Sequence, residues 1–177
     1  MKRHTVFRWA AGLALMTAVG LTVGPAGGQP PGKKGGGKGN PDLKADQATF
    51  HYLLEHHKDI RRTVKKLDAG VETTTESDVA DVAKKIHEHV PAMYERMKAN
   101  RPLRVWDPLF AELFRHADKV KMAVEKTAKG VKVTETSDDP AVARLIQAHA
   151  DVVSRFVETG FAEAHKEHPV PDGGKKK

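Results

Sequence analysis

Residues 64–78 read VKKLDAGVETTTESD, and residues 124–138 read VEKTAKGVKVTETSD. The likeness extends to both sides at a constant offset of 60 residues, so residues 50–97 align with residues 110–157 without a gap. The fourteen identical pairs among these 48 positions are Phe50/Phe110, Leu53/Leu113, His56/His116, Val64/Val124, Lys66/Lys126, Gly70/Gly130, Val71/Val131, Thr74/Thr134, Ser77/Ser137, Asp78/Asp138, Val82/Val142, Ala83/Ala143, Ile86/Ile146 and His89/His149. Chance does not produce so many ungapped identities, so we infer an internal duplication.

Each copy has the pattern of a helical hairpin. In the first copy, apolar residues over positions 50–67 recur at steps of three and four, which predicts one amphipathic helix. Gly70 then stands where a glycine in the left-handed conformation commonly ends a helix. The Thr-rich residues 71–76 are interpreted as a connection, and Ser77 or Asp78 as the start of a second helix, whose apolar residues lie over positions 79–97.

The second copy repeats this pattern with clearer helix starts. Asp107-Pro108 and Asp139-Pro140 each combine a helix-capping residue with a proline suited to the first turn. Only residues 131–134, VKVT, alternate like a strand, and they are interpreted as part of the interhelical loop. We therefore predict an all-α protein, an up-down-up-down four-helix bundle built from two duplicated hairpins at about residues 46–99 and 106–168.

The ends of the chain have a different composition from this predicted bundle. A basic start, an apolar run of about 15 residues and small residues after it predict a secretory signal peptide over residues 1–26, with an uncleaved anchor as the alternative. Residues 27–41 are a predicted Gly/Lys/Pro-rich linker, and residues 169–177 a basic tail, both flexible. We expect a periplasmic or secreted protein without stable membrane insertion after cleavage, its folded part spanning residues 42–168.

The positive charge of the chain lies in these ends. Nine of the 30 Lys and Arg residues fall within the first 38 residues or the last three, which leaves 21 against 23 Asp and Glu in residues 42–172. A nucleic-acid-binding domain carries its basic surface on the folded part, so we expect no nucleic-acid partner. The absence of cysteine excludes disulfides, iron–sulfur clusters and thiol nucleophiles.

Histidines are the candidate functional residues. His56 lies 14 residues before Gly70, and His89 lies 12 residues after Ser77. At about 1.5 Å of rise per residue, both would lie at a similar height in antiparallel helices. The duplication repeats this arrangement, so one layer of four imidazoles is expected. The predicted cofactor-binding and metal-ligating residues are His56, His89, His116 and His149.

Imidazoles in a bundle core are suitable ligands for haem iron or a transition-metal ion. We therefore expect an exported protein that binds haem or such an ion for electron transfer, storage or sensing, with a redox or envelope protein as a possible partner. The alternative is a non-catalytic cell-envelope structural or interaction module whose histidines are only packed and hydrogen-bonded, or respond to pH. No catalytic motif favours an enzyme, and the sequence gives no oligomeric state.

Overall fold

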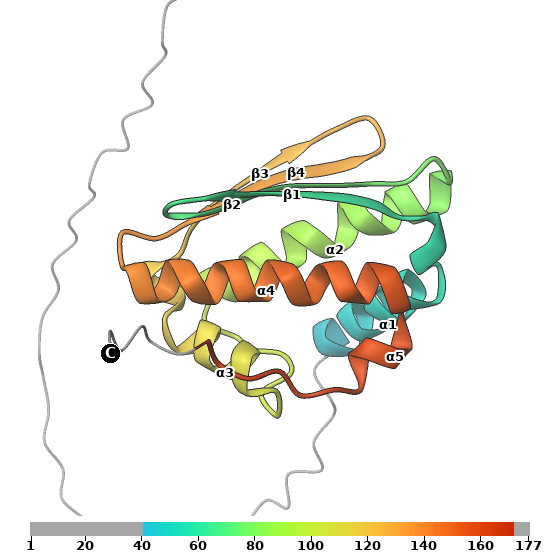
Figure 1. Ribbon diagram of the computed structural model, residues 1–177. Helices are drawn as coiled ribbons and strands as arrows, with labels where there is room; N and C mark the ends of the chain where they lie inside the picture. The colour runs from blue at the N-terminus through green and yellow to red at the C-terminus, as the bar shows by residue number, and fades with distance from the viewer. Residues whose placement is uncertain (1–40, 172–177) are drawn as a thin grey trace, which may run out of the picture. The chain divides into compact units, whose positions relative to one another are not determined.

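A computed structural model of the chain describes residues 41–171 and shows an α+β fold, in which helices cover one face of a four-stranded sheet (Figure 1). The elements are α1 (Pro41–Glu55), η1 (His57–Asp59), β1 (Arg61–Leu67), β2 (Gly70–Glu76), α2 (Ala80–Lys98), α3 (Pro108–Arg115), η2 (Ala117–Lys119), β3 (Lys121–Lys126), β4 (Gly130–Thr136), α4 (Pro140–Thr159) and α5 (Phe161–Ala164). Here η marks a short 3-10 helix. Each copy thus runs through a helix, a 3-10 turn, two strands and a helix, and α5 follows the second copy.

The sheet joins the two copies through their second strands. Its order is β1-β2-β4-β3, and all neighbouring strands are antiparallel. In the central β2–β4 pair, Thr73 faces Val133, the residue 60 positions later. Each pair on one side of it has an equivalent on the other side, as Gly70–Thr136 and Glu76–Gly130 show. A pseudo-twofold axis therefore passes through the Thr73–Val133 pair.

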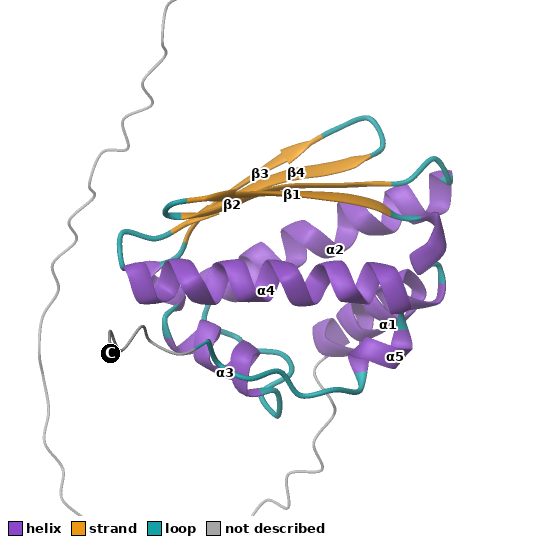
Figure 2. Ribbon diagram, viewed as in Figure 1, coloured by secondary structure: helices purple, strands orange, loops and turns teal. Residues whose placement is uncertain are grey.

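The second helix of each copy packs mainly on the hairpin of the other copy. Helix α2 contacts β4 and β3, and helix α4 contacts β2 and β1. Figure 2 shows both helices beneath the same face of the sheet, with α1, α3 and α5 farther from it. Helix α1 contacts α2, while α3 and α5 contact α4. The two copies are therefore interlocked in one unit.

Buried aliphatic side chains hold each helix to the opposite hairpin. Ile86 of α2 is 1% exposed and packs with Val131 and Val133 of β4. Its counterpart Ile146 of α4 is equally buried and packs in a second cluster with Val71 of β2. Burial of one such side chain stabilises a fold by about 1.5–3 kcal/mol. The identities shared by the two copies include these helix positions because both packing contacts require them.

The expected all-α four-helix bundle is wrong, and β1 shows why. Helix α1 ends at Glu55, and the predicted stripe over residues 50–67 runs on through η1 into β1. Within that strand, Arg62 and Val64 are partly buried, whereas their neighbours Thr63 and Lys65 are exposed. Because one inward position holds an arginine, the two-residue period of the strand is not visible as an alternation of apolar and polar residues.

The segments interpreted as interhelical connections are the central strands of the sheet. Their Thr and Val residues are β-branched, which favours strands. Gly70 does not end a helix but begins β2, where a Cβ would lie 1.9 Å from the carbonyl oxygen of Glu135 in β4. At Gly130 of β4 a Cβ would lie 2.1 Å from the carbonyl oxygen of Thr75. The repeated glycine therefore permits the close approach of the two copies.

The predicted starts of α3 and α4 are confirmed. The carboxylate of Asp107 accepts a hydrogen bond from the backbone N–H of Leu109 at 3.2 Å, and that of Asp139 accepts one from Ala141 at 2.9 Å. Each cap is followed by a proline in the first turn, as the sequence predicted. The sequence predicted a helix start correctly where a capping carboxylate accepts a hydrogen bond from a backbone N–H of the first turn.

Several sequence predictions concern residues that the structure does not describe. The predicted signal peptide over residues 1–26 lies outside the described residues, as do residues 27–40 of the predicted linker and residues 172–177 of the predicted tail. Among residues 41–171, no helix combines the length and the apolar character needed to cross a membrane.

Candidate functional site

A cavity of about 490 Å³ lies at the centre of the fold. All four strands and all five α-helices described above contribute to its lining, which consists mainly of apolar and aromatic side chains. The axis residues Thr73 and Val133 form part of the lining on the sheet. The volume falls within the range of about 300–1,000 Å³ that is typical of small-molecule sites. The interlocking of the copies thus encloses a space that either copy alone could only half surround.

His89 and His149 occupy equivalent positions on α2 and α4 and both line this cavity. Their rings pack against equivalent phenylalanines, with a centroid distance of 5.7 Å from His89 to Phe50 and 5.1 Å from His149 to Phe110. The Nδ1 atom of each ring is buried and has no hydrogen-bond partner. Burial lowers the pKa of each imidazole from 6.5 to about 4, so both rings are neutral at pH 7.

His56 and His116, the other two predicted ligands, are not part of the cavity lining. His56 lies just after α1, where its side chain is 37% exposed and faces Asp59. His116 lies at the equivalent place after α3 and contacts Glu112 at 3.1 Å. The expected height of these rings assumed continuous helices, but both helices end there and strands follow.

The structure therefore brings together two of the four predicted histidines. Within residues 41–171, no group of three or more His, Asp or Glu side chains is arranged to hold a metal ion. The four histidines therefore do not form the predicted layer with one ring from each of four helices. The physical premise of this layer, a four-helix bundle, does not exist in an α+β fold.

Two charged side chains that the sequence analysis missed also face the cavity. Arg62 of β1 donates from Nη1 to the hydroxyl of Thr75 at 2.6 Å, and its Nε is buried without a partner. Burial lowers its pKa to about 10, although the carboxylate of Glu135 partly opposes this effect. Glu135 of β4 is 8% exposed, and its burial raises its pKa to about 6 against the attraction of Arg62.

A third charged side chain, that of Arg104, also contributes to the lining. Its guanidinium carbon lies 4.3 Å from the ring centroid of Trp106, 5.0 Å from that of Phe110 and 5.2 Å from that of Phe156. Cations are attracted to aromatic faces at these distances. The Nε atom of Arg104 is buried and has no hydrogen-bond partner.

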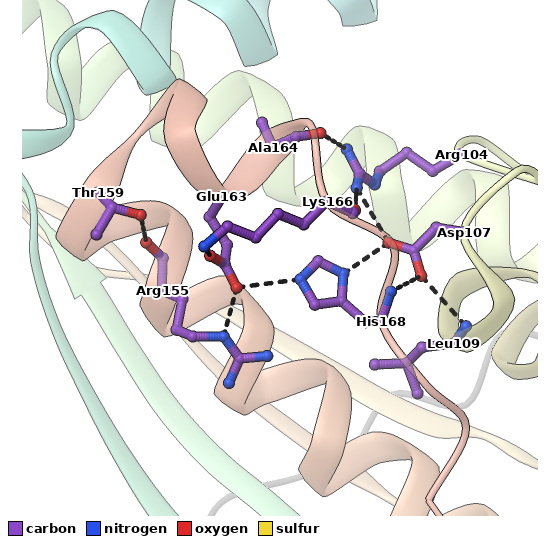
Figure 3. A network of polar contacts seen from close by, with 9 residues as sticks. All are labelled: Arg104, Asp107, Leu109, Arg155, Thr159, Glu163, Ala164, Lys166 and His168. Atoms are coloured by element: carbon purple, nitrogen blue, oxygen red, sulfur yellow. Dashed lines mark hydrogen bonds and ion pairs between the residues drawn. The ribbon is translucent and has the colours of Figure 1, made fainter.

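A buried polar network holds Arg104 in this position (Figure 3). Its guanidinium donates to the carboxylate of Asp107 at 3.0 Å and to the carbonyl of Ala164 at 2.7 Å. His168 lies between two carboxylates, with Nδ1 2.7 Å from Asp107 and Nε2 3.1 Å from Glu163. Burial tends to raise the pKa of Asp107, but the hydrogen bonds from His168 and Arg104 outweigh it and keep that pKa below its usual value. This network joins the start of α3 to the chain after α5 and thereby fixes one wall of the cavity.

Unpartnered buried polar atoms are concentrated on the cavity lining. Among the described residues, five buried side-chain nitrogen or oxygen atoms lack a hydrogen-bond partner. Four of them belong to residues that line the cavity, namely Arg62, His89, Arg104 and His149. Such groups are costly to bury without a partner, by about 1–3 kcal/mol each. The cavity is therefore apolar in bulk and carries unused hydrogen-bonding capacity at defined points.

The sequence contained one indication of the missed charged residues: each aligns with an uncharged residue in the other copy. Arg62 aligns with Met122, and Glu135 aligns with Thr75. A charge that replaces an uncharged residue at an inward position marks a place where the copies differ in environment. This signal could be used only once the strands, and hence the inward positions, were known.

Comparison with known proteins adds no relatives. No protein-family model, no curated protein and no solved structure matches this chain.

Proposed function

We propose that this protein binds a small, largely apolar organic molecule in the central cavity. The observation that carries the proposal is the placement of four side chains, each with one buried nitrogen atom that lacks a hydrogen-bond partner, around a single cavity with mainly apolar walls. Apolar walls with a few convergent polar groups are characteristic of ligand sites. A bound molecule would fill the space and accept hydrogen bonds from groups that otherwise lack them.

Haem is the specific candidate that both the sequence expectation and the cavity support. His89 and His149 are neutral imidazoles on the lining of one cavity, and neutral imidazole is an axial ligand of haem iron. The guanidinium groups of Arg62 and Arg104 are suited to pair with the carboxylates of haem. Bound haem would supply a redox-active iron; the protein's part would be to hold the ring among apolar side chains.

Titration with two probes tests the proposal. Haemin is followed by its Soret absorbance, and the neutral fluorophore N-phenyl-1-naphthylamine reports an apolar site without iron or charge. We expect both to bind with 1:1 stoichiometry. His89→Ala and His149→Ala should each shift the Soret band and weaken haemin binding, because each removes one imidazole from the cavity.

The repeat offers matched controls. His56→Ala and His116→Ala are identical exchanges at equivalent positions outside the cavity, and they should leave the haemin spectrum unchanged. Binding of the fluorophore without haemin would reject haem and retain the broader proposal. Failure of both probes to bind the folded protein would overturn it in favour of the alternative expected from the sequence, an interaction or structural module with packed histidines. Export to the periplasm or beyond stays a prediction.

A further inference from the structure

We propose that the cavity places the charged groups of its ligand on opposite sides of the pseudo-twofold axis, an acid group beside Arg62 and an amino group beside Glu135. This inference rests on the proposed function and names the chemical class of the ligand, an apolar molecule with an acid group at one end, an amino group at the other, or both. Haem, whose charged side groups are all acids, would use only the position beside Arg62.

The helices and strands divide the cavity into two sides. On the first side, α4 packs mainly on β1 and β2, and α3 packs on α4; on the second, α2 packs mainly on β3 and β4, and α1 packs on α2. Arg62 belongs to the first side and Glu135 to the second. Electrostatic contacts follow this division. Beyond the effect of burial, the charge of Arg62 lowers the pKa of His149 in α4, whereas that of Asp46 in α1 raises the pKa of His89 in α2.

The strand register keeps Arg62 and Glu135 apart. Arg62 pairs with Thr75 between β1 and β2, and Glu135 pairs with Met122 between β4 and β3. In β2, Thr75 lies four residues from Val71, which is the partner of Glu135. The two backbone positions are therefore separated by about 13 Å along the strands and by two strand spacings, about 10 Å, across the sheet. This separation suits two groups at different ends of a ligand.

The side of the cavity that contains Arg62 holds most of the unused nitrogen atoms. One arm of its guanidinium is fixed by the 2.6 Å bond to Thr75, and its Nε–H is buried and unpartnered. The ring of His149 and the guanidinium of Arg104 both pack against Phe110 of α3, and each has one buried nitrogen atom without a partner. A guanidinium presents its donors in a planar fork that matches a carboxylate. An acid group is therefore expected on this side.

The other side of the cavity contains a buried acid. Glu135 is 8% exposed, and burial raises its pKa to about 6, so it is mostly ionised at pH 7. The side chains of its strand partners, Met122 and Val71, have no hydrogen to donate, and within the described part of the chain its carboxylate accepts no hydrogen bond. Asp46 also lines this side, but its carboxylate pairs with Arg96. Since a buried carboxylate without a donor is costly, an amino group of the ligand would supply both the donors and the opposite charge.

Three probes of the same chain length test this inference: dodecanoate, which is anionic, dodecylamine, which is cationic, and dodecan-1-ol, which is neutral. Each is titrated at pH 7 into the full-length protein loaded with N-phenyl-1-naphthylamine, and displacement of the fluorophore gives its affinity. We expect the wild-type protein to bind dodecanoate and dodecylamine each at least about tenfold more tightly than the alcohol, because hydrogen bonds between oppositely charged groups are stronger than neutral ones.

The two preferences should depend on different residues. Arg62→Met should bring the affinity ratio of dodecanoate to the alcohol close to one and leave the ratio for dodecylamine intact, and Glu135→Thr should do the reverse. Each exchange introduces the residue found in the other copy, which limits the risk of misfolding. Arg62→Met/Glu135→Thr leaves neither buried charge and should lose both preferences with the affinity for the alcohol unchanged. It keeps the test decisive if a single variant fails to fold.

Lys65→Met and Glu125→Thr are the matched controls. They remove a charge of the same sign at exposed positions of β1 and β3, and both should keep the wild-type ratios. Equal affinity for the alcohol and either charged probe in the wild-type protein overturns the inference. So does the loss of both preferences in one single variant, or a preference that survives the exchange of its own residue.

The outcomes separate this inference from the proposed function. If N-phenyl-1-naphthylamine binds and neither charged probe is preferred over the alcohol, the cavity binds ligands but the placement of charged groups is wrong. If N-phenyl-1-naphthylamine and haemin both fail to bind the folded wild-type protein, the proposed function itself fails.

Discussion

Residues 50–97 and 110–157 build the same series of elements, yet the side chains with which they line their shared cavity differ in part. The helix positions that pack against the opposite hairpin are retained, as Ile86 and Ile146 show. Some inward positions on the strands have diverged, so that the charged Arg62 and Glu135 correspond to the uncharged Met122 and Thr75. Packing requirements are the same in both halves, whereas contact with a ligand need be made only once. The diverged positions thus make the two halves of the cavity unlike, although the identical pairs His89/His149 and Phe50/Phe110 also line it.

The largest effect is expected where the two copies are most alike, at the glycines of the central strands. Gly70→Ala and Gly130→Ala each place a Cβ about 2 Å from a backbone oxygen of the neighbouring strand, where only movement of the strands can make room. We expect each to cost more than about 4 kcal/mol or to prevent folding, the range of the most severe single substitutions. Urea unfolding followed by circular dichroism measures this.

Thr74→Ala serves as a control, since it lies on the same strand without a buried side chain and should cost less than about 1 kcal/mol. A Gly→Ala variant with near wild-type stability would show that the strands can separate without loss, against the close approach described here.

The second prediction concerns the buried polar network around Asp107, just before the second copy. Asp107 is fully buried and binds both Arg104 and His168, so Asp107→Ala leaves two buried partners without their carboxylate. Removal of one member of a buried ion pair costs about 3 kcal/mol or more. The equivalent residue Gln47 is exposed, and Gln47→Ala should change the free energy of unfolding by less than about 0.5 kcal/mol. Equal effects at the two positions would contradict the asymmetry of the network.

The third prediction concerns pH and the symmetric imidazole pair. His89 and His149 have pKa values of about 4 in the folded protein against 6.5 for an ordinary histidine, so the unfolded chain takes up these protons first. The stability they contribute is complete above about pH 6.5 and is lost as the pH falls toward 4, by about 3 kcal/mol per ring. Glu135 acts in the opposite sense, because its raised pKa adds stability as the pH falls through 6.

The double variant His89→Phe/His149→Phe isolates the contribution of the rings. Urea unfolding at pH 7 and at pH 4.5 should show a markedly smaller loss of stability in this variant than in the wild-type protein. His56→Phe/His116→Phe makes the same exchange outside the cavity and should retain the wild-type loss. Parallel pH dependence in all three proteins would mean that the cavity rings are solvated.

The sequence predicted the helices that carry explicit signals and failed where a strand had the spacing of a helix. Helices α2 and α4 lie where apolar stripes predicted them, and α4 begins at the predicted cap. The strands were missed because the inward face of β1 carries Arg62, which conceals the alternation that a buried strand normally shows. The Thr-rich strands were short enough to pass for connections. Pairing between distant strands, which decides this fold, leaves no local periodic signal.

The candidate site was predicted in part, for a related reason. His89 and His149 lie on helices that were correctly predicted, so their common placement could be expected from the repeat. The predicted positions of His56 and His116 assumed helices that continue to Gly70 and Gly130, whereas α1 and α3 end just before these histidines and strands follow. These two positions were therefore wrong because the fold was wrong. Arg62 and Glu135 could not be recognised as cavity residues, because the side of the sheet that a side chain faces cannot be assigned before the strand itself is predicted.

The smallest effect is expected where different side chains perform the same task in the two copies. His87 of α2 donates from Nε2 to the carbonyls of Gly130 at 2.7 Å and of Thr127 at 3.1 Å, in the hairpin of the second copy. Its equivalent, Gln147 of α4, donates to the carbonyl of Leu67 at 2.8 Å in the hairpin of the first copy. These bonds contribute to the interlocking, since each joins a helix of one copy to the hairpin of the other.

Because Gln147 makes the equivalent bond with an amide, His87→Gln should be nearly neutral, within about 0.5 kcal/mol, whereas His87→Ala should cost about 1–2 kcal/mol by leaving a partly buried carbonyl without its donor. Gln147→His is the reciprocal exchange and should be tolerated equally well. Urea unfolding at pH 7 compares all three variants with the wild-type protein. If His87→Gln were as damaging as His87→Ala, the imidazole would have a role that the amide cannot fill, and the two hairpins would not be held by equivalent contacts.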